Sequence, residues 1–475
     1  MKDVIKRIAI MAFALAIVFA FLPDFGLSEA YAGENSLKGT YLASTLSDKY
    51  SGQNLICDGD LKIIMNQDLD LWSLESDYDI DIVSEGDVTY TLKLSGKDAR
   101  IQGNKIYVQN TILSVDQIDE NGSDTDKYAI EADDEFIVDD SMIVIVAKNG
   151  IKANGVFNLV SSYCSVYSYY PDGEGILIDK EPLYIDVSAL QITMSGENSY
   201  GIRSTEGDIN FISSYDCVIR TESENSFPIY GKGNVVFSKS DVELIGNKAA
   251  CVAPTAGLII KKNNYIKVPT KGDVVKYNIN FDTIGDPNGK IAKKVTISKK
   301  YLSDKACTVY APNKVYTGDR IRPIVVRWNG NKITKDKSYK VSYSNNLNVG
   351  KAKVTIKGIG NFTGKVVKYF KINPKGTTLL KPEPLSKAVR VKWKIQKARM
   401  SKTHITGYKI KVATNKSFTK NVKTVTVKGY SKVSRRIKNL KAKKKYYVKI
   451  RTYKVINSKY YYSKWSAYKT FTTKG

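Results

Sequence analysis

A repeat of 21 to 27 residues constrains the fold of this chain more than any other feature of its sequence. Each unit begins with a Gly or Ala followed by an apolar residue. Those apolar residues are Ile130, Ile151, Ile176, Ile202, Ile229 and Cys251. A second short apolar run, and a third after a Ser- or Asn-rich corner, complete most units. Three short strands per unit fit the coil of a parallel β-helix, whose apolar side is buried only when coils stack. An ordinary β-sandwich, the alternative, would not produce six units in phase.

Three segments of this region share a pattern punctuated by Gly and Asn. They are G-I-K-A-N-G at 150–155, G-I-R-S-T-E-G-D-I at 201–209 and N-G-K-I-A-K-K-V-T-I-S-K at 288–299. Through them, residues roughly 50–299 resemble the exported β-helix proteins of Gram-positive bacteria that contain carbohydrate-binding domains. The resemblance implies a body that binds acidic or plant-type polysaccharides, in some members with calcium.

The chain after residue 300 carries two further β-rich patterns. The first comprises V-Y-T-G at 315–318, the run 339–346 and G-K-A-K-V-T-I-K-G at 350–358. It makes residues 301–374 resemble an immunoglobulin-like repeat of Gram-positive surface proteins. Short alternating strands with Gly and Asn turns agree with a sandwich of this size.

The second pattern lies at the C-terminus. Val389-Arg-Val-Lys-Trp393 contains a strand tryptophan, and Leu440 and Tyr446 have the spacing of a tyrosine corner. With Ser463-Lys-Trp-Ser466 before the last strand, residues 376–475 resemble a fibronectin type III domain. The resemblance is informative about fold and says little about function.

The first 32 residues have the composition of a signal peptide. Lys2, Lys6 and Arg7 precede an apolar run, and Ala30-Tyr-Ala32 offers small residues where a signal peptidase cleaves. We expect cleavage before Gly33 and a secreted protein without an integral membrane segment. Association of the secreted protein with the cell wall is left open. A retained membrane anchor is the alternative, but the apolar run is short for crossing a bilayer.

These observations predict an all-β protein, a right-handed parallel β-helix followed by two β-sandwich modules. The expected domains are a signal peptide at 1–32, the β-helix at 33–299, an immunoglobulin-like sandwich at 300–374 and a fibronectin type III sandwich at 375–475.

The formal net charge of +27 is distributed unevenly along the chain. Residues 291–475 contain 49 Lys and Arg and four acids, whereas residues 1–290 contain 25 basic and 43 acidic side chains. Outside the cell, a basic surface meets acidic polysaccharides and wall polymers rather than nucleic acid. The predicted partner is therefore a polysaccharide or an anionic cell-wall polymer such as teichoic acid, and not nucleic acid.

Alternation along the last module places its basic side chains outside. Val389, Val391 and Trp393 point inward, so that the residues between them face solvent, and the strand around Tyr408 follows the same rule. The candidate wall-contact residues are Arg390, Lys392, Lys394, Lys409 and Lys411. The alternative is that these charges only keep the module soluble and protect its sheet edges.

Aromatic side chains are the candidate ligand-binding residues of the repeat region. They are Tyr163, Tyr167, Tyr169 and Tyr170. Alternation would place the first three on one face, opposite Cys164 and Val166, where rings can stack on sugars. Ordinary packing on a β-sheet surface is the alternative.

Two acidic loops supply the hard oxygen ligands that Ca²⁺ prefers. The loop at 119–126 is not an EF-hand, because Gln117 and Tyr128 occupy the first and twelfth ligand positions. Calcium is the one cofactor left open, and solvated acidic turns are the alternative. The candidate ligands are Asp119, Asp124, Asp126, Asp133 and Asp134.

No catalytic motif is present. The chain lacks G-x-S-x-G and H-E-x-x-H, and its single histidine, His404, lies in a Lys-rich segment. Five scattered cysteines without C-x-x-C spacing argue against zinc and leave one disulfide open. We expect a non-enzymatic protein. The alternative is a calcium-dependent lyase or hydrolase of the β-helix type, in which Arg203 or Arg220 would serve as the base.

Overall fold

The computed structural model describes residues 36–86, 88–117, 125–400 and 403–475. Within these ranges the protein consists of strands β1 to β44 and one helix, α2 (Ala43–Tyr50). The all-β prediction is therefore confirmed. No helix of the described ranges has the length and apolarity needed to cross a membrane. The predicted signal peptide at 1–32 lies outside the described residues.

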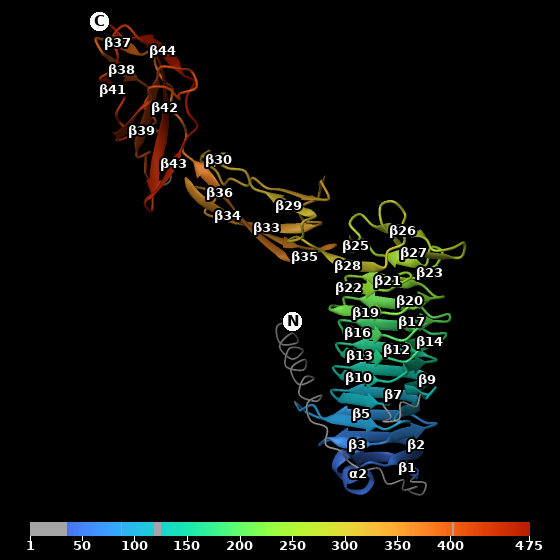
Figure 1. Ribbon diagram of the computed structural model, residues 1–475. Coiled ribbons are helices and arrows are strands. Elements are labelled where there is room, and N and C mark those ends of the chain that lie inside the picture. Colours follow the sequence, from blue (N-terminus) through green and yellow to red (C-terminus); the bar gives the residue numbers. More distant parts are fainter. Residues whose placement is uncertain (1–35, 87, 118–124, 401–402) are drawn as a thin grey trace. The chain divides into compact units, whose positions relative to one another are not determined.

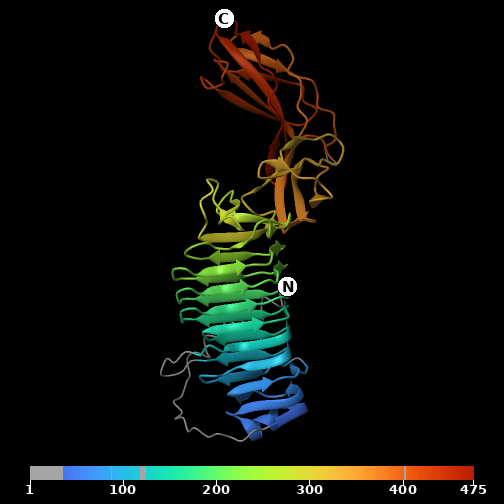
Figure 2. The ribbon, with the colours of Figure 1, turned by 90° about the vertical axis from the view of Figure 1, so that its right-hand side faces the viewer.

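The chain divides into two compact units. The first contains the residues up to Pro182 together with Ile192–Arg203, and the second contains Leu183–Gln191 together with Ser204–Gly475. Figures 1 and 2 show the strands of both units in the colours of the sequence.

Successive repeats of the first unit pair their strands in parallel. One sheet contains β1 (Ser36–Leu42), β2 (Asn54–Met65), β4 (Ser73–Ser76), β5 (Ile80–Ser84), β7 (Ile101–Gln109), β9 (Tyr128–Asp139), β11 (Asn149–Ala153), β12 (Val156–Val160) and β14 (Glu174–Ile178). A second contains β3 (Leu69–Leu71), β6 (Thr91–Ser95), β8 (Ile112–Asp116), β10 (Met142–Val146) and β13 (Tyr163–Ser168). Each repeat thus adds strands to two sheets.

Alternate side chains of these strands form the core of the first unit. Leu113, Ile143 and Cys164 are opposite one another in register and are fully buried. Phe136 and Phe157 are paired in the same way in the other sheet, and their rings stack with centroids 4.8 Å apart. Burial of each such side chain contributes about 1.5–3 kcal/mol to the stability of the fold. A single isolated repeat would lack this contribution, because its apolar side chains are buried only against neighbouring repeats.

Polar corners join the two sheets in a repeated geometry. A left-handed residue, Asn110, Asp140 or Ser161, precedes a buried hydroxyl at each corner. The backbone N–H of Thr111 donates to Ser141 Oγ (3.1 Å), and that of Ser141 donates to Ser162 Oγ (3.0 Å). The Ser-rich corners of the sequence are therefore a ladder of hydrogen bonds between repeats.

The G-I-K-A-N-G segment ends in a turn that only glycine fits. A Cβ on Gly155 would lie 1.3 Å from the carbonyl oxygen of Asp134 in the preceding repeat. Because real Cβ atoms never approach a carbonyl oxygen so closely, a side chain here would push the two repeats apart.

The second unit begins with the same parallel pairing. One set of strands is β15 (Leu183–Asp186), β18 (Ile209–Ile212), β21 (Val235–Ser238) and β24 (Leu258–Ile260), and another pair is β19 (Cys217–Thr221) and β22 (Val242–Ile245). Phe211 and Phe237 stack with centroids 5.2 Å apart. The parallel pairing ends where β28 (Lys294–Tyr301) joins β22 antiparallel, followed by β25 (Asn264–Val268).

Short strands complete the repeats. They are β16 (Ala189–Met194), β17 (Tyr200–Ser204), β20 (Phe227–Gly231), β23 (Ala253–Pro254), β26 (Asp273–Lys276) and β27 (Phe281–Gly285). The last three form a small antiparallel sheet.

Residues 300–374, here called the middle sandwich, form two small sheets. One consists of β29 (Cys307–Tyr310), β31 (Val325–Trp328) and β32 (Asn331–Lys332). The other consists of β30 (Lys314–Val315), β36 (Lys365–Asn373), β34 (Gly350–Gly358) and β33 (Tyr339–Ser344), and the short β35 (Phe362–Thr363) pairs with β28. Val326, Val354 and Ile356 are fully buried in a shared cluster.

Residues 375–475, here called the C-terminal sandwich, form two sheets around one core. The first sheet contains β37 (Glu383–Leu385), β38 (Ala388–Lys392) and β41 (Ser434–Lys438). The second contains β40 (Lys423–Lys428), β39 (Gly407–Ala413), β42 (Lys445–Ile456), β43 (Lys459–Tyr462) and β44 (Lys469–Thr472).

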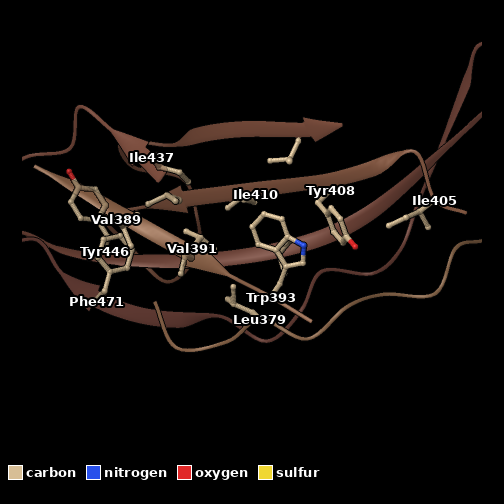
Figure 3. Packing of buried hydrophobic residues seen from close by; sticks show 14 of the residues in the cluster. Leu379, Val389, Val391, Trp393, Ile405, Tyr408, Ile410, Ile437, Tyr446 and Phe471 are labelled. Atoms are coloured by element: carbon tan, nitrogen blue, oxygen red, sulfur yellow. The ribbon is translucent and has the colours of Figure 1, made fainter. Parts of the chain in front are cut away.

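Trp393 lies in the middle of this core, with its ring centroid 5.0 Å from that of Tyr408 (Figure 3). The Tyr446 hydroxyl accepts a hydrogen bond from the backbone N–H of Lys441 (2.9 Å), one residue after the buried Leu440. The Leu440–Tyr446 spacing in the sequence therefore corresponds to a tyrosine side chain that fixes the chain entering β42.

Candidate functional site

The outer face of the larger C-terminal sheet carries four cations on two neighbouring strands. Lys409 and Lys411 of β39 lie directly opposite Arg451 and Lys449 of β42. Residues between them on each strand, such as Ile410, point into the core and are fully buried. Like charges opposite one another destabilise a sheet, so this arrangement requires compensation from other groups.

Aromatic rings surround these cations. The Arg451 guanidinium carbon lies 3.8 Å from the ring centroid of Tyr462 and 4.4 Å from that of Trp465. Lys449 Nζ lies 3.9 Å from the ring centroid of Phe418 and 5.2 Å from that of Trp465. Each such contact is worth about 0.5–2 kcal/mol, depending on how far the cation is removed from water.

The two lysines of β39 lie farther from the aromatic rings than Lys449 and Arg451 do. Lys409 Nζ is 5.5 Å from the ring of Tyr462, and Lys411 Nζ is 5.8 Å from the ring of Trp465. We call the four cations together with Tyr462, Trp465 and Phe418 the basic face.

Burial and mutual repulsion affect the protonation of the basic face. Burial, followed by the positive charges of Lys411 and Arg451, lowers the pKa of the Lys449 ammonium below its ordinary value. Burial also lowers the pKa of Arg451, and its Nε atom is buried without a hydrogen-bond partner in the described part of the chain. An anionic group bound here would relieve the repulsion among these cations.

In the described residues, no salt bridge joins a carboxylate to any of the four cations of the basic face. Glu383 is the single acidic residue of 375–475, and it lies on β37, in the other sheet of the sandwich. There its carboxylate pairs with Lys392 (3.0 Å) and Arg390 (3.7 Å). Because the core lies between the two sheets, their outer faces point in opposite directions.

The structure thus divides the predicted wall-contact residues into two groups. It places Arg390 and Lys392 on β38 beside Glu383, with Lys394 just beyond the end of that strand. It places Lys409 and Lys411 on the basic face, together with Lys449 and Arg451. Trp465 and Phe418 were not among the predicted site residues, although a tryptophan near strands of alternating cations was a signal that could have identified the first.

A hollow of about 520 Å³ near the end of β43 has a similar lining. Lys351, Lys371 and Lys459 contribute its cations, and Tyr369 and Tyr460 contribute exposed rings. The ring of Tyr460 stacks on that of Tyr462, with centroids 6.0 Å apart. The aromatic and basic surface therefore extends beyond the basic face itself.

The tyrosines predicted to bind a ligand lie on and after β13. Tyr163 and Tyr167 are half-buried on the outward side of this strand, and Tyr169 and Tyr170 follow its end. Tyr169 is 68% exposed. Burial raises the pKa of Tyr163 to about 12. Two of the four tyrosines therefore share a strand face, and Tyr169 is largely exposed to solvent.

The acidic residues predicted to bind calcium have separate partners. Asp126 pairs with Lys148 (3.0 Å), Asp134 pairs with Lys105 (3.3 Å), and Asp133 accepts a hydrogen bond from Asn154 Nδ2 (3.2 Å). The other two candidates, Asp119 and Asp124, lie outside the described residues. Within the described ranges, no group of three or more potential metal ligands comes together.

The two arginines considered as catalytic bases are both near carboxylates. Arg203 Nε lies 2.7 Å from an oxygen of Glu174, whose other oxygen accepts a hydrogen bond from the Tyr128 hydroxyl. Arg220 lies 4.0 Å from Glu222. Burial, followed by the charge of Glu174, raises the pKa of Tyr128, so that its phenol remains neutral.

All five cysteines fall within the described residues and are free thiols. Burial raises the pKa of Cys57, Cys164 and Cys217 to about 12, and it also raises those of Cys251 and Cys307. Such thiols pack as small apolar side chains.

No family model matches the chain, and no curated protein matches it. Among solved structures, it is similar to a crystal structure of the chicken CNTN1 FN1–FN3 domains at 12% identity and a TM-score of 0.19. The match covers 45% of this chain and 90% of that one. At so low a TM-score, the sheets described above remain the basis for any conclusion about fold.

Proposed function

We propose that this protein is an exported, non-enzymatic, surface-associated protein that binds an anionic envelope polymer through the basic face. The C-terminal sandwich would be a fibronectin type III-like module, and the middle sandwich an immunoglobulin-like spacer. The observation that carries the proposal is the set of four cations opposite one another, to which no carboxylate is paired in the described part of the chain.

Electrostatics supplies the driving force. Two unit charges about 6 Å apart repel each other by roughly 0.7–3 kcal/mol for an effective dielectric constant of about 20–80. A phosphate or carboxylate placed between such pairs turns this repulsion into attraction, and the flanking rings exclude water from the contact. A repeating polyanion would satisfy several cations at once, so that binding depends on chain length and on salt.

The repeat region is proposed to be a right-handed parallel β-helix that contributes polysaccharide recognition or adhesion. Parallel pairing of strands one repeat apart supports the solenoid, and crossovers between parallel strands are almost always right-handed. The exposed ring of Tyr169 and the outward-facing Tyr163 and Tyr167 support a role in stacking on sugars. Secretion rests on the signal-peptide composition of residues 1–32.

The test compares two double variants with equal loss of charge. Lys409→Gln/Lys411→Gln removes two cations from the basic face, and the control Arg390→Gln/Lys392→Gln removes two from the sheet that contains Glu383. Binding of the purified protein to isolated cell walls that retain teichoic acid is measured by co-sedimentation across a salt series. Walls stripped of teichoic acid are the second control.

We expect the basic-face variant to bind at least fivefold less at low salt, and the control to stay within twofold of the unmodified protein. Binding of both should be lost by a few hundred millimolar salt, as the Debye length falls well below about 10 Å. Equal loss in the two variants would show that net charge alone governs binding, and undiminished binding to stripped walls would exclude the polymer.

A further inference from the structure

A hollow of about 480 Å³ in the middle sandwich combines cations with an apolar floor. Arg320, Arg322 and Lys335 line it, together with Ile324, Val341 and Tyr343. We infer that this hollow binds a single phosphate-bearing polyhydroxyl unit, a sugar phosphate or polyol phosphate. This site is separate from the basic face and does not depend on the proposed function.

The two arginines are presented by a backbone segment that is fixed in place. Ile321 between them is 8% exposed and packs in a cluster with Phe370 and Ile372. Its N–H donates to the carbonyl oxygen of Asn346 (2.7 Å), and its carbonyl oxygen accepts from Asn346 Nδ2 (3.0 Å). Arg320 and Arg322 flank this buried residue and are both exposed. Because the backbone between them is already held in place, little backbone order is lost on binding.

Neither guanidinium is neutralised within the described part of the chain. No salt bridge there joins Arg320 or Arg322 to a carboxylate, and both side chains are exposed. Lys335, by contrast, lies 3.3 Å from Asp336. A guanidinium presents a planar fork of donors that matches phosphate oxygens in pairs, so two adjacent forks favour phosphate over a neutral sugar.

The floor of the hollow fits the remainder of such a unit. Tyr343 lies on β33 with its ring centroid 6.5 Å from that of Phe370 in an edge-to-face arrangement, and Val341 lies two residues before it. Burial raises the pKa of the Tyr343 phenol to about 12, so its hydroxyl is a neutral donor at physiological pH. Aromatic and aliphatic surface beside donors suits a sugar ring or polyol, and the volume is within the range of small-molecule sites.

Calorimetric titration of the full chain with glucose 6-phosphate and glycerol 3-phosphate tests the inference. Glucose and inorganic phosphate are the comparison ligands. We expect both esters to bind, inorganic phosphate to bind at least threefold more weakly, and glucose not to bind. Binding of glucose equal to that of glucose 6-phosphate would overturn the role of the arginines, and inorganic phosphate binding as tightly as the esters would overturn the role of the floor.

Variants separate this site from the basic face. Arg320→Gln/Arg322→Gln should weaken binding of the esters at least tenfold, whereas Lys409→Gln/Lys411→Gln should leave it within twofold. Arg320→Lys/Arg322→Lys keeps the charge and removes the forks, and we expect a loss of about fivefold. Unchanged ester binding by the lysine variant would contradict recognition by paired guanidinium donors. If the basic-face variant lost as much ester binding as Arg320→Gln/Arg322→Gln, the esters would not be binding specifically in this hollow.

Discussion

Replacement of Ser141 by alanine tests whether the corner hydroxyls hold successive repeats together. Ser141 Oγ donates to the carbonyl oxygen of Asp139 (2.7 Å) and accepts from the N–H of Thr111 (3.1 Å) in the preceding repeat. Ser141 is 5% exposed and Thr111 is fully buried. Without the hydroxyl, the Thr111 N–H has no partner and no access to water, which costs about 1–3 kcal/mol.

The measurement must report on this corner alone, because a chain of several modules does not unfold in one two-state transition. Hydrogen–deuterium exchange of peptides covering residues 105–117 meets that need. A loss of about 1–3 kcal/mol should accelerate exchange there by roughly 5-fold to 150-fold. Peptides of the C-terminal sandwich should exchange as before.

The matched control is Ser114→Ala. Ser114 lies on β8, only three residues from Thr111, but its side chain points outward and is half-buried. We expect little change in exchange for this variant. Equal acceleration in Ser114→Ala and Ser141→Ala, or no acceleration in either, would refute the assignment of the corner hydroxyls as links between repeats.

Four further predictions concern other parts of the chain. Trp465→Ala removes the ring beside Arg451 and Lys449 and should destabilise the C-terminal sandwich by about 1–2 kcal/mol, as measured by calorimetry. The control is Tyr468→Ala, which replaces an exposed ring and should have little effect. Thiol labelling of the folded protein should modify the half-buried Cys307 first. Burial raises the folded-state pKa of Cys164 and Cys217 from 9.0 to about 12. Their contribution to stability is therefore complete below pH 9 and declines as the pH rises from 9 to about 12. A lower free energy of unfolding at pH 10 than at pH 8, measured by chemical denaturation, would show this decline. Incubation with pectin-type polyuronates should release no unsaturated uronic acids with or without calcium, and release that a chelator abolishes would establish the lyase alternative instead.

The periodicity of the sequence was sufficient to predict which side chains face the core. Alternation with a period of two is a local property, since each peptide unit turns the next side chain to the opposite face. It correctly places Val389, Val391 and Trp393 inside the C-terminal sandwich, and Lys409 and Lys411 on its outer face. The all-β composition follows from the same pattern.

Contacts between distant segments required the tertiary structure. The Ser-rich corners were visible in the sequence, but the bond from Thr111 to Ser141 depends on the register between two repeats. Likewise, Asp126, Asp133 and Asp134 are close in sequence, yet each finds a different partner. No local rule selects these partners, because they lie in other repeats, more than twenty residues away in the sequence.

The basic face shows the same division. From its sequence alone, the chain presents cations on alternate positions of two strands. Only the fold pairs Lys411 with Lys449, brings Trp465 and Phe418 beside them, and keeps Glu383 in the other sheet. Alternation decides whether a side chain faces solvent, whereas strand pairing and sheet packing decide which other charges and rings it meets there.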